Sequence, residues 1–439
     1  MINRWLFTQI DNSALIIFRV FFGFLIAAEA IGAIFTGWVR KTLIEPEFTF
    51  NFIGFDFLQP LPGNGMYFYF ALMGIFGLLI MIGYRYRFSM TAYTILWAGV
   101  YFMQKSSYNN HYYLLLLLLL MMIILPAGNY FSVDVKQNPS LKKIAMPRWV
   151  VLFIILQLWI VYTYAAIAKL YPDWLDFTVA KNLMAGRAYY PVVGPILQHH
   201  WAHVSVAYFG ILFDLLVIPL LLWKRTRFTI FCLGIFFHLF NSVVFQIGIF
   251  PYLSLAFSVF FFSKEKIHRI FMKKKEFYAG NEIIVPSYKK FLIPVVIIWF
   301  AIQITLPIRH WFIPGDVLWT EEGHRLSWRM MLRGRSGITS FYTIDKNDPK
   351  KERKIVNKKA YLTSKQIRSV NTKPDFMWQF AQRLKEKYAA EGKEIEVYAK
   401  SSVSVNGNKR KVLIDPEVDL ANVPWNYFTT NPWVLKYSD

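Results

Sequence analysis

Long apolar runs separated by short polar loops fill the first two thirds of the chain. A helix needs about 20 mostly apolar residues to cross the hydrocarbon of a bilayer. On that criterion we expect nine spans, over Ala14–Trp38, Gly65–Gly83, Ser89–Gln104, Tyr112–Ala127, Trp149–Ala168, Val204–Trp223, Phe228–Gln246, Ile249–Phe262 and Phe291–Leu306. The fourth and the eighth are short for a span. The pattern predicts a membrane all-α helical bundle of about eight to nine transmembrane helices over residues 1–306.

The charges of the loops indicate the direction of the spans. Four basic loops fall on one side: "YRYR", "KQNPSLKKIAMPR", "WKRTR" and "SKEKIHRIFMKKKEF". The opposite loops "QKSSYNNH" and "QIGIFPY" carry almost no positive charge. The positive-inside rule places the basic set in the cytoplasm. With an odd number of spans, the C-terminal region then lies outside, and so do Lys169 and His111.

The composition becomes that of a water-soluble domain from about Pro307. "GITSFYTID" and "KERKIVN" flank the turn-rich "KNDPKK" and predict a hairpin. "PDFMWQFAQRLKEKYAAEG" has helical spacing and a glycine stop. "EIEVYAKSSVSVNGNKRKVLID" holds Asn-Gly between two strand-like runs, which predicts a second hairpin. We therefore expect a small extracytoplasmic α+β domain over residues 307–439.

Composition and charge narrow the class of protein. The 439 residues are 55% hydrophobic and 17% charged, whereas soluble domains carry about a quarter charged residues. The net charge of +22 sits mostly in the loops, which indicates a lipid bilayer as partner and no nucleic acid. The single Cys232 excludes an internal disulfide and a thiolate cluster. "LQHHWAH" has no matching acidic or Cys ligands, so we predict no metal site.

Polar groups inside apolar spans are expensive and often face a cavity or a partner. Asn110 and His111 open one span at its outer end, where helix capping is the alternative to a functional role. His238 and Asn241 lie three residues apart on one helix face. An interhelical hydrogen bond explains them too, but we favour a cavity. For Asp214 we favour a structural partnership.

Lys169 ends an apolar run in "YAAIAKLYPDW". A lysine at a helix end commonly extends into the lipid headgroups. The other interpretation is a desolvated, neutral base. His111 is expected on the same membrane side, which favours the interpretation as a neutral base. Such an amine can deprotonate a lipophilic acid such as a hydroquinone.

Several of these segments are similar to one known family. The motifs are "NNHYYL", "NYFSVD", "VYTYAAIAKLYPDWL", "FFHLFNSVVFQIGIFPYLSLA", "RLSWRMMLRGRSG" and "VLIDPEVDLANVPWNYF". In order and spacing they resemble the vitamin K-dependent γ-glutamyl carboxylase family over most of the chain. The resemblance implies an enzyme that couples epoxidation of reduced vitamin K, or of a menaquinol-type quinol, by O2 to proton abstraction from a protein-bound Glu and addition of CO2.

The resemblance also implies roles for particular residues. Lys169 matches the base that deprotonates the hydroquinone, and Asn110 and His111 match the pair beside the quinone headgroup. Quinone binding is implied for His238, Asn241, Met330 and Met331. Binding of the Glu-containing peptide is implied for Arg335, His310 and Trp319.

Some features depart from the animal members of that family. Ala168 stands where they have a second lysine, and the long lumenal region that helps them bind a propeptide is missing after "NPWVLKYSD". We expect a bacterial inner-membrane homologue. Two alternatives stay open: a quinol epoxidase without glutamate carboxylation, and a non-catalytic quinone-binding or transport protein. A transporter predicts a polar path through the spans, whereas the polar groups here cluster toward the outer half.

Overall fold

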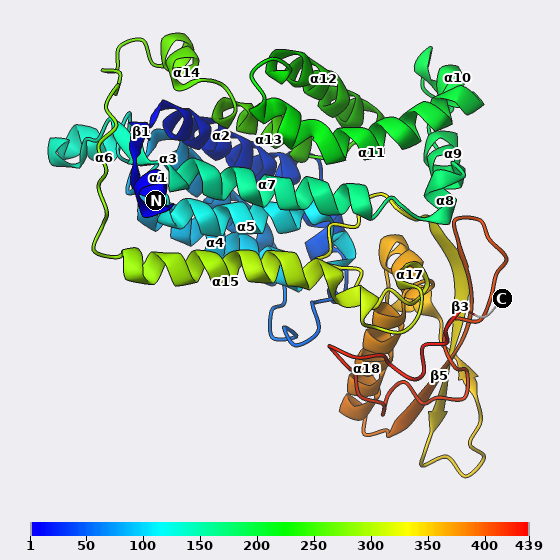
Figure 1. The fold of residues 1–439 in the computed structure, drawn as a ribbon. Coiled ribbons are helices and arrows are strands. Elements are labelled where there is room, and N and C mark those ends of the chain that lie inside the picture. Colours follow the sequence, from blue (N-terminus) through cyan, green and yellow to red (C-terminus); the bar gives the residue numbers. More distant parts are fainter. Residues whose placement is uncertain (1, 438–439) are drawn as a thin grey trace.

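The computed structural model describes residues 2–437 and consists of a helical bundle with an α+β domain against one end (Figure 1). The N-terminus lies at the opposite end of the bundle. The principal bundle helices are α2 (Ser13–Phe35), α3 (Gly65–Ile82), α4 (Tyr86–Met103), α5 (Asn110–Ile124), α7 (Trp149–Ile167), α11 (His200–Leu222), α12 (Arg227–Phe240), α13 (Phe250–Phe257) and α15 (Lys289–Ile308). The shorter helices of this part are α1 (Ile2–Phe7), α6 (Val133–Gln137), α8 (Pro172–Leu175), α9 (Thr178–Ala185), α10 (Val193–Leu197) and α14 (Lys264–Phe271).

Each of the nine predicted ranges contains a helix, so the helical membrane architecture is confirmed. Six helices are long and apolar enough to cross a membrane by themselves. Helix α5 and the α13 segment Phe250–Phe260 are shorter, and they correspond to the two ranges that were short in the sequence. The count of eight to nine spans stays a prediction.

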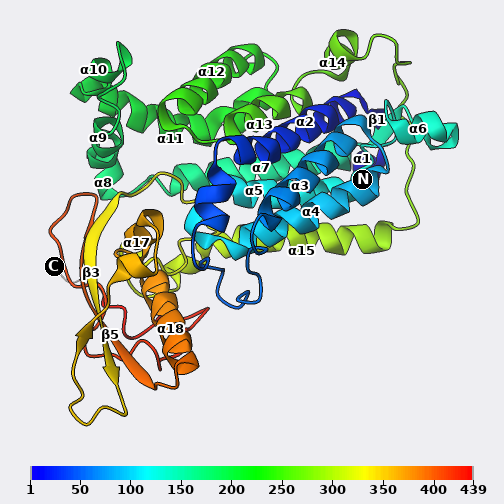
Figure 2. The same ribbon diagram turned by 180° about the vertical axis from the view of Figure 1, so that it is seen from behind.

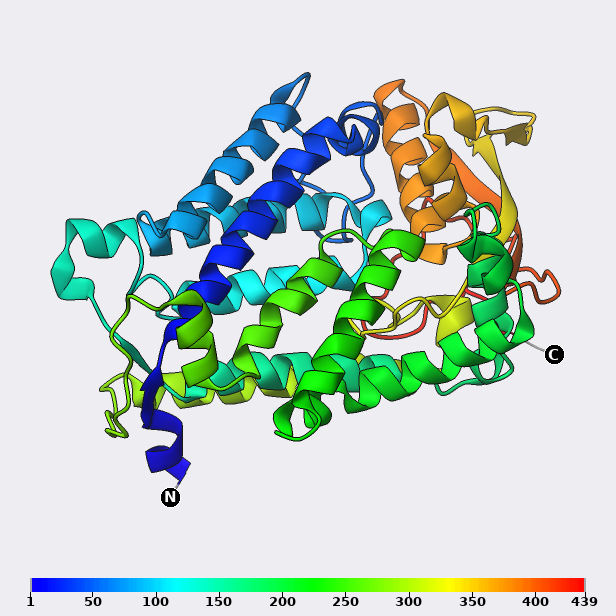
Figure 3. The ribbon, with the colours of Figure 1, turned by 90° about the horizontal axis from the view of Figure 1, so that it is seen from above.

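Helix α2 runs obliquely across the bundle between α3 and α13 (Figure 3). Close packing on α3 depends on small residues: a Cβ atom on Gly77 would lie 2.8 Å from the Cα of Ala27. Glycine at such positions lets the backbones of two helices approach.

The end of the bundle away from the α+β domain is held by a buried ion pair. Strands β1 (Gln9–Asp11) and β2 (Ala145–Pro147) pair there in antiparallel register. The Nζ of Lys275 lies 2.5 Å from Oδ2 of Asp11, and neither side chain is exposed. The backbone N–H of Tyr278 donates to the same carboxylate. Lys275, one residue of the basic loop, therefore holds the N-terminal segment in place.

The α+β domain is built on strands β3 (Arg335–Asp345), β4 (Lys354–Ile355) and β5 (Ile395–Val405), in the order β4-β3-β5. The predicted β3–β4 hairpin is confirmed, and so is the predicted helix, as α18 (Pro374–Ala390). Asn406 and Gly407 both have positive φ and form the predicted turn. Beyond it, one bridge joins Val403 to Lys411, whereas β5 pairs along its length with β3.

A second buried ion cluster fixes the α+β domain to the bundle. Lys105, between α4 and α5, has its Nζ 2.5 Å from Oδ2 of Asp375 in α18, and Arg325 lies 2.9 Å from the same oxygen. Burial alone would raise the pKa of Asp375, but the charges of Arg325 and Lys105 hold it well below its usual value. Burial lowers the pKa of Lys105 to about 8 despite the neighbouring carboxylate. Figure 2 shows this end of the bundle from behind, with α8–α10 beside the same domain.

Candidate active site

A cavity of about 500 Å³ lies where the bundle meets the α+β domain. We call it the junction cavity. Its walls are the N-terminal turn of α5, the loop 246–248 before α13, and the segment 321–333 that leads into β3. Four of the predicted site residues line it: Asn110, His111, Met330 and Met331.

At the start of α5, the residue that caps the helix is different from the residues that line the junction cavity. Asn109 is the cap, because its side chain accepts a hydrogen bond of 2.8 Å from the N–H of Tyr112. Asn110 is thereby free for another role, and its Nδ2 donates to the backbone oxygen of Arg329 at 2.9 Å. The His111 ring stacks on Phe250, with 4.2 Å between the ring centroids. Capping therefore does not account for Asn110 and His111.

The segment 321–333 is strained. Leu326, Trp328 and Met331 have φ of 59°, 56° and 54°, a region that non-glycine residues seldom adopt. Each such residue costs about 1–3 kcal/mol and persists where its surroundings fix it. Trp328 supplies that anchor, because it is fully buried and stacks on Tyr113 at 4.8 Å. The anchored segment contributes Arg329, Met330 and Met331 to the lining of the cavity.

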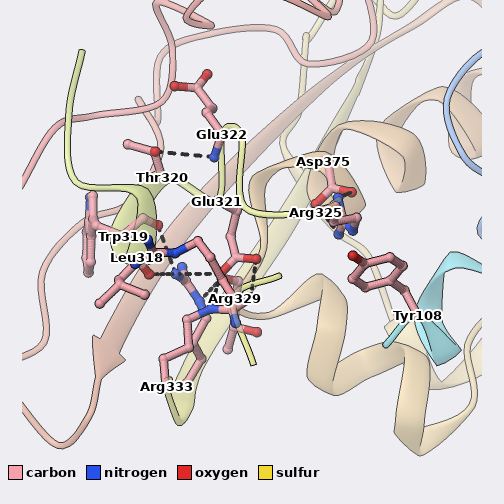
Figure 4. A network of polar contacts seen from close by, with 12 residues as sticks. Tyr108, Leu318, Trp319, Thr320, Glu321, Glu322, Arg325, Arg329, Arg333 and Asp375 are labelled. Carbon is pink, nitrogen blue, oxygen red and sulfur yellow. Dashed lines mark hydrogen bonds and ion pairs between the residues drawn. The ribbon is translucent and has the colours of Figure 1, made fainter. Parts of the chain in front are cut away.

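Glu321 is the centre of a network of arginines at the edge of the cavity (Figure 4). Both of its carboxylate oxygens accept from Arg333, and its Oε1 lies 3.2 Å from Nη1 of Arg335. Burial alone would raise the pKa of Glu321, but Arg333, His324 and Arg335 hold it well below the usual value.

Arg335 and Trp319 lie away from the junction cavity. The Arg335 side chain is 4% exposed and donates to the backbone oxygens of Leu318, Trp319 and Thr372 as well as to Glu321. Trp319 is in the core of the α+β domain, and its Nε1 donates to Leu435 O at 2.8 Å. The protein itself therefore occupies the groups that the resemblance assigns to the substrate.

Lys169 points into the bundle rather than toward the headgroups. Its Nζ lies 2.5 Å from Oδ2 of Asp214 in α11 and 3.1 Å from the backbone oxygen of Ala165. Both charged side chains are buried. Asp214, which we expected to be a structural partner, is thus the direct partner of Lys169. Lys169 is not among the residues that line the junction cavity.

A second cavity, of about 540 Å³, lies between the C-terminal ends of α7 and α15. We call it the lateral cavity. Ala168 and Leu170, the neighbours of Lys169, line it, together with His310 and Arg329. Arg329 also lines the junction cavity, so the two cavities meet at this residue. Trp311 in the lateral wall is 62% exposed, as expected of an aromatic residue at a membrane boundary.

His238 and Asn241 are buried beside the junction cavity without lining it. His238 borders a small cavity of about 40 Å³, where its Nε2 lies 3.4 Å from the Tyr162 hydroxyl. Its ring also contacts Phe250, the residue on which His111 stacks. Asn241 begins a π-helical turn, a feature that recurs at functional sites.

Sequence reasoning missed Glu29 in the middle of α2. Glu29 lines a mainly apolar cavity of about 200 Å³ and accepts a hydrogen bond of 2.9 Å from the Tyr112 hydroxyl. Trp97 and Tyr101 line the same cavity, and their Nε1 and hydroxyl groups are buried without a hydrogen-bond partner among the described residues. Tyr112 also lines the junction cavity. An acid inside the run "FLIAAEAIG" was the signal available in the sequence.

Two family models match successive parts of the chain. Residues 7–265 match the family model described as HTTM domain. Residues 288–439 match the model described as Vitamin K-dependent gamma-carboxylase, lumenal domain. No solved structure matches the chain. The first match covers more than half of the chain, so this is a multi-pass membrane protein of the HTTM class. With both domains present, the chain belongs to the vitamin K-dependent γ-carboxylase family.

Proposed function

We propose that this protein is a quinol-dependent γ-glutamyl carboxylase, which couples epoxidation of reduced vitamin K or a menaquinol-type quinol to carboxylation of Glu in a peptide or protein. The observation that carries the proposal is the junction cavity. It has Asn110 and His111 from the membrane bundle on one wall and Met330 and Met331 from the extracytoplasmic half on another. A lipid-borne quinol and a water-borne peptide can meet in such a cavity.

The aromatic and methionine side chains of the lining, Trp38, Tyr108, Tyr112, Met330 and Met331, fit a lipophilic aromatic ligand. Methionine and aromatic side chains give a soft, adaptable contact surface, and the apolar cavity beside Glu29 continues from it through Trp38, Tyr108 and Tyr112. The reduced quinone, when bound, supplies together with O2 the strong base that the weakly acidic γ-proton requires. The protein binds and orients both substrates and excludes water.

Lys169 and Asp214 are proposed to act together as the base. In a buried Lys–Asp pair, one proton is shared between the amine and the carboxylate. A second proton can bind at the carboxylate, or at the amine after the amine has transferred its own proton to the carboxylate. The proton from the quinol hydroxyl therefore has a place within the pair. Ala168 and Leu170, the chain neighbours of Lys169, line the lateral cavity, and we propose that this space is where the pair meets the quinol.

A second candidate is a quinol epoxidase that does not carboxylate glutamate. It is favoured by one observation: Arg335 and Trp319, the implied glutamate-side residues, are occupied by backbone oxygens and Glu321. Both candidates share the quinol chemistry and differ in whether a peptide carboxylate is bound.

One assay separates the candidates. Purified protein in lipid nanodiscs is given reduced vitamin K or menaquinol, labelled bicarbonate and a peptide with a single Glu, and epoxide and incorporated label are followed separately. The matched control is the same peptide with Gln. Label in the Glu peptide together with epoxide supports the carboxylase, and epoxide without label supports the epoxidase. If neither product forms with either quinol, the enzyme proposal is wrong.

A further inference from the structure

Arg329 occupies an unusual place in the fold. It lines both the junction cavity and the lateral cavity, yet its side chain belongs to a residue that is 9% exposed. The Asn110 side chain holds its backbone oxygen, and the strained Trp328 precedes it in the chain. Arg329 is therefore held in a fixed position between the two cavities, with its Nη1 beside His310 of the lateral wall.

The charge of Arg329 has no acidic partner within 4.0 Å among the described residues. Arg333 and Arg325 differ, because they pair with Glu321 and Asp375. The Nε of Arg329 is buried and has no hydrogen-bond partner in the described part of the chain. Burying a cation in this way is unfavourable unless an anion joins it.

His310 positions this guanidinium without neutralising it. The Nδ1 of His310 lies 2.7 Å from the backbone oxygen of Pro307, so it carries the ring proton. The Nε2 atom is then an acceptor, and Nη1 of Arg329 donates to it at 3.2 Å. A neutral imidazole leaves the positive charge of Arg329 available to a ligand.

We propose that Arg329 is the anion-binding residue of the junction cavity and that its ligand is the side-chain carboxylate of a glutamate in the peptide substrate. This deepens the proposed function, on which it rests. The planar fork of arginine matches two carboxylate oxygens. Since Met330 and Met331 follow Arg329 directly, a carboxylate bound there lies beside the surface proposed for the quinone. Arg335 is the weaker candidate for this role, because its side chain already binds Glu321 and backbone oxygens.

The test measures binding without turnover. Full-length protein in nanodiscs, with no quinol present, is titrated with a fluorescent peptide that contains a single Glu and with its Gln isostere. We expect the protein to prefer the Glu peptide by about 10- to 100-fold, the range of a charge-assisted hydrogen bond. Arg329→Gln will reduce this preference to within about 3-fold, and Arg329→Lys will leave an intermediate preference, because it keeps the charge but loses the fork.

The preference is a ratio within one preparation, so a smaller folded fraction does not change it. Arg333→Gln is the matched control, since it removes one charge from the same cavity wall; its Glu preference is expected to remain. Loss of the preference in Arg333→Gln but not in Arg329→Gln overturns the proposal, and so does a wild-type protein without any preference. A preference that depends on Arg329 in a protein that forms neither epoxide nor labelled peptide supports the anion site and refutes the proposed function alone.

Discussion

The Nζ of Lys169 lies 2.5 Å from Oδ2 of Asp214, and both residues are buried between α7 and α11. Lys169 is therefore not an isolated amine at a helix end. The pairing makes the two residues one proton-holding unit, in which neither charge is compensated if the other is removed. Two predictions follow from it.

Lys169→Ala is expected to lower the rate of epoxide formation by about 10²–10⁴-fold, the usual contribution of general-base catalysis. Lys169→Arg will be as inactive, because arginine keeps the ion pair but does not give up its proton. The measurement is epoxide formed per mole of folded protein. Near-native rates in Lys169→Arg would show that Lys169 is not the base, whereas partial rescue of Lys169→Ala by small amines would support it.

Asp214→Asn is expected to lose both stability and epoxide formation, because removal of one partner from a buried pair costs about 3–5 kcal/mol. The double variant Lys169→Met/Asp214→Leu removes both charges and will recover much of the stability, measured by thermal unfolding in detergent. It will not recover epoxide formation. If turnover returned with stability, the pair would be structural only.

Arg335→Ala is expected to act first on stability and only secondarily on peptide carboxylation, since Arg335 binds Glu321 and three backbone oxygens. The loss will be about 3–5 kcal/mol, as for a broken buried pair. The experiment compares the thermal midpoint with the peptide KM. An unchanged midpoint with a raised KM would return Arg335 to the substrate site that the family resemblance implied.

The contact between the bundle and the α+β domain is expected to depend on pH. Lys373 directly precedes α18 and lines the junction cavity. Burial lowers the pKa of Lys105 and of Lys373 to about 8, against about 10.4 for lysine in an unfolded chain. Between these values the unfolded chain binds more protons, so the free energy of unfolding rises with pH. The pKa of Asp375 is depressed, so its stabilisation is present above about pH 4 and is lost as the pH falls through the folded value.

The check is the difference in thermal midpoint between wild-type protein and Lys105→Met at pH 7 and pH 10. The thermal midpoint of the wild-type protein will rise relative to that of the variant as the pH rises, because only the wild-type protein carries this buried lysine. A difference that stays constant over the interval would contradict the assignment of Lys105.

The orientation of the chain is testable with tags. A tag after Asp439 is expected to be extracytoplasmic, and a tag at Lys274 cytoplasmic, by the positive-inside rule. Lys275 itself is unsuitable, because its amine is buried against Asp11. The measurement is labelling of intact cells with a membrane-impermeant reagent. Labelling of the tag at Lys274 without permeabilisation would show that the predicted orientation is inverted.

The sequence was most informative where a local pattern decides the structure. Each apolar run became a helix, and the Pro374–Ala390 helix and the β3–β4 hairpin followed from periodicity and turn residues. Pairings between distant segments were not accessible: Ile395 of β5 joins Asp345 of β3 across 50 residues, and no short-range signal specifies that.

The candidate site shows the same limit. Motif matching selected Asn110, His111, Met330 and Met331 from their positions along the chain, and in the structure all four line one cavity. It failed to foresee that Glu321 would occupy Arg335, since a motif does not reveal which partner the folded chain supplies. Arg329 carries no distinguishing pattern in the sequence, and its significance depends on the acidic groups that are missing around it.

The hydrogen bond from Asn110 to the backbone oxygen of Arg329 joins the two halves of the molecule at the cavity itself. On the proposed function, neither half holds a complete reaction chamber: the membrane bundle brings Asn110 and His111, and residues 309–437 bring Arg329, Met330 and Met331. In a chimaera, the quinol will be bound only where the two halves fit each other, because side chains proposed for the quinol come from both, whereas the choice of protein substrate will be inherited with residues 309–437. The specificity for the protein substrate can therefore diverge while the contacts that join the halves, this hydrogen bond and the Lys105–Asp375–Arg325 cluster among them, are kept.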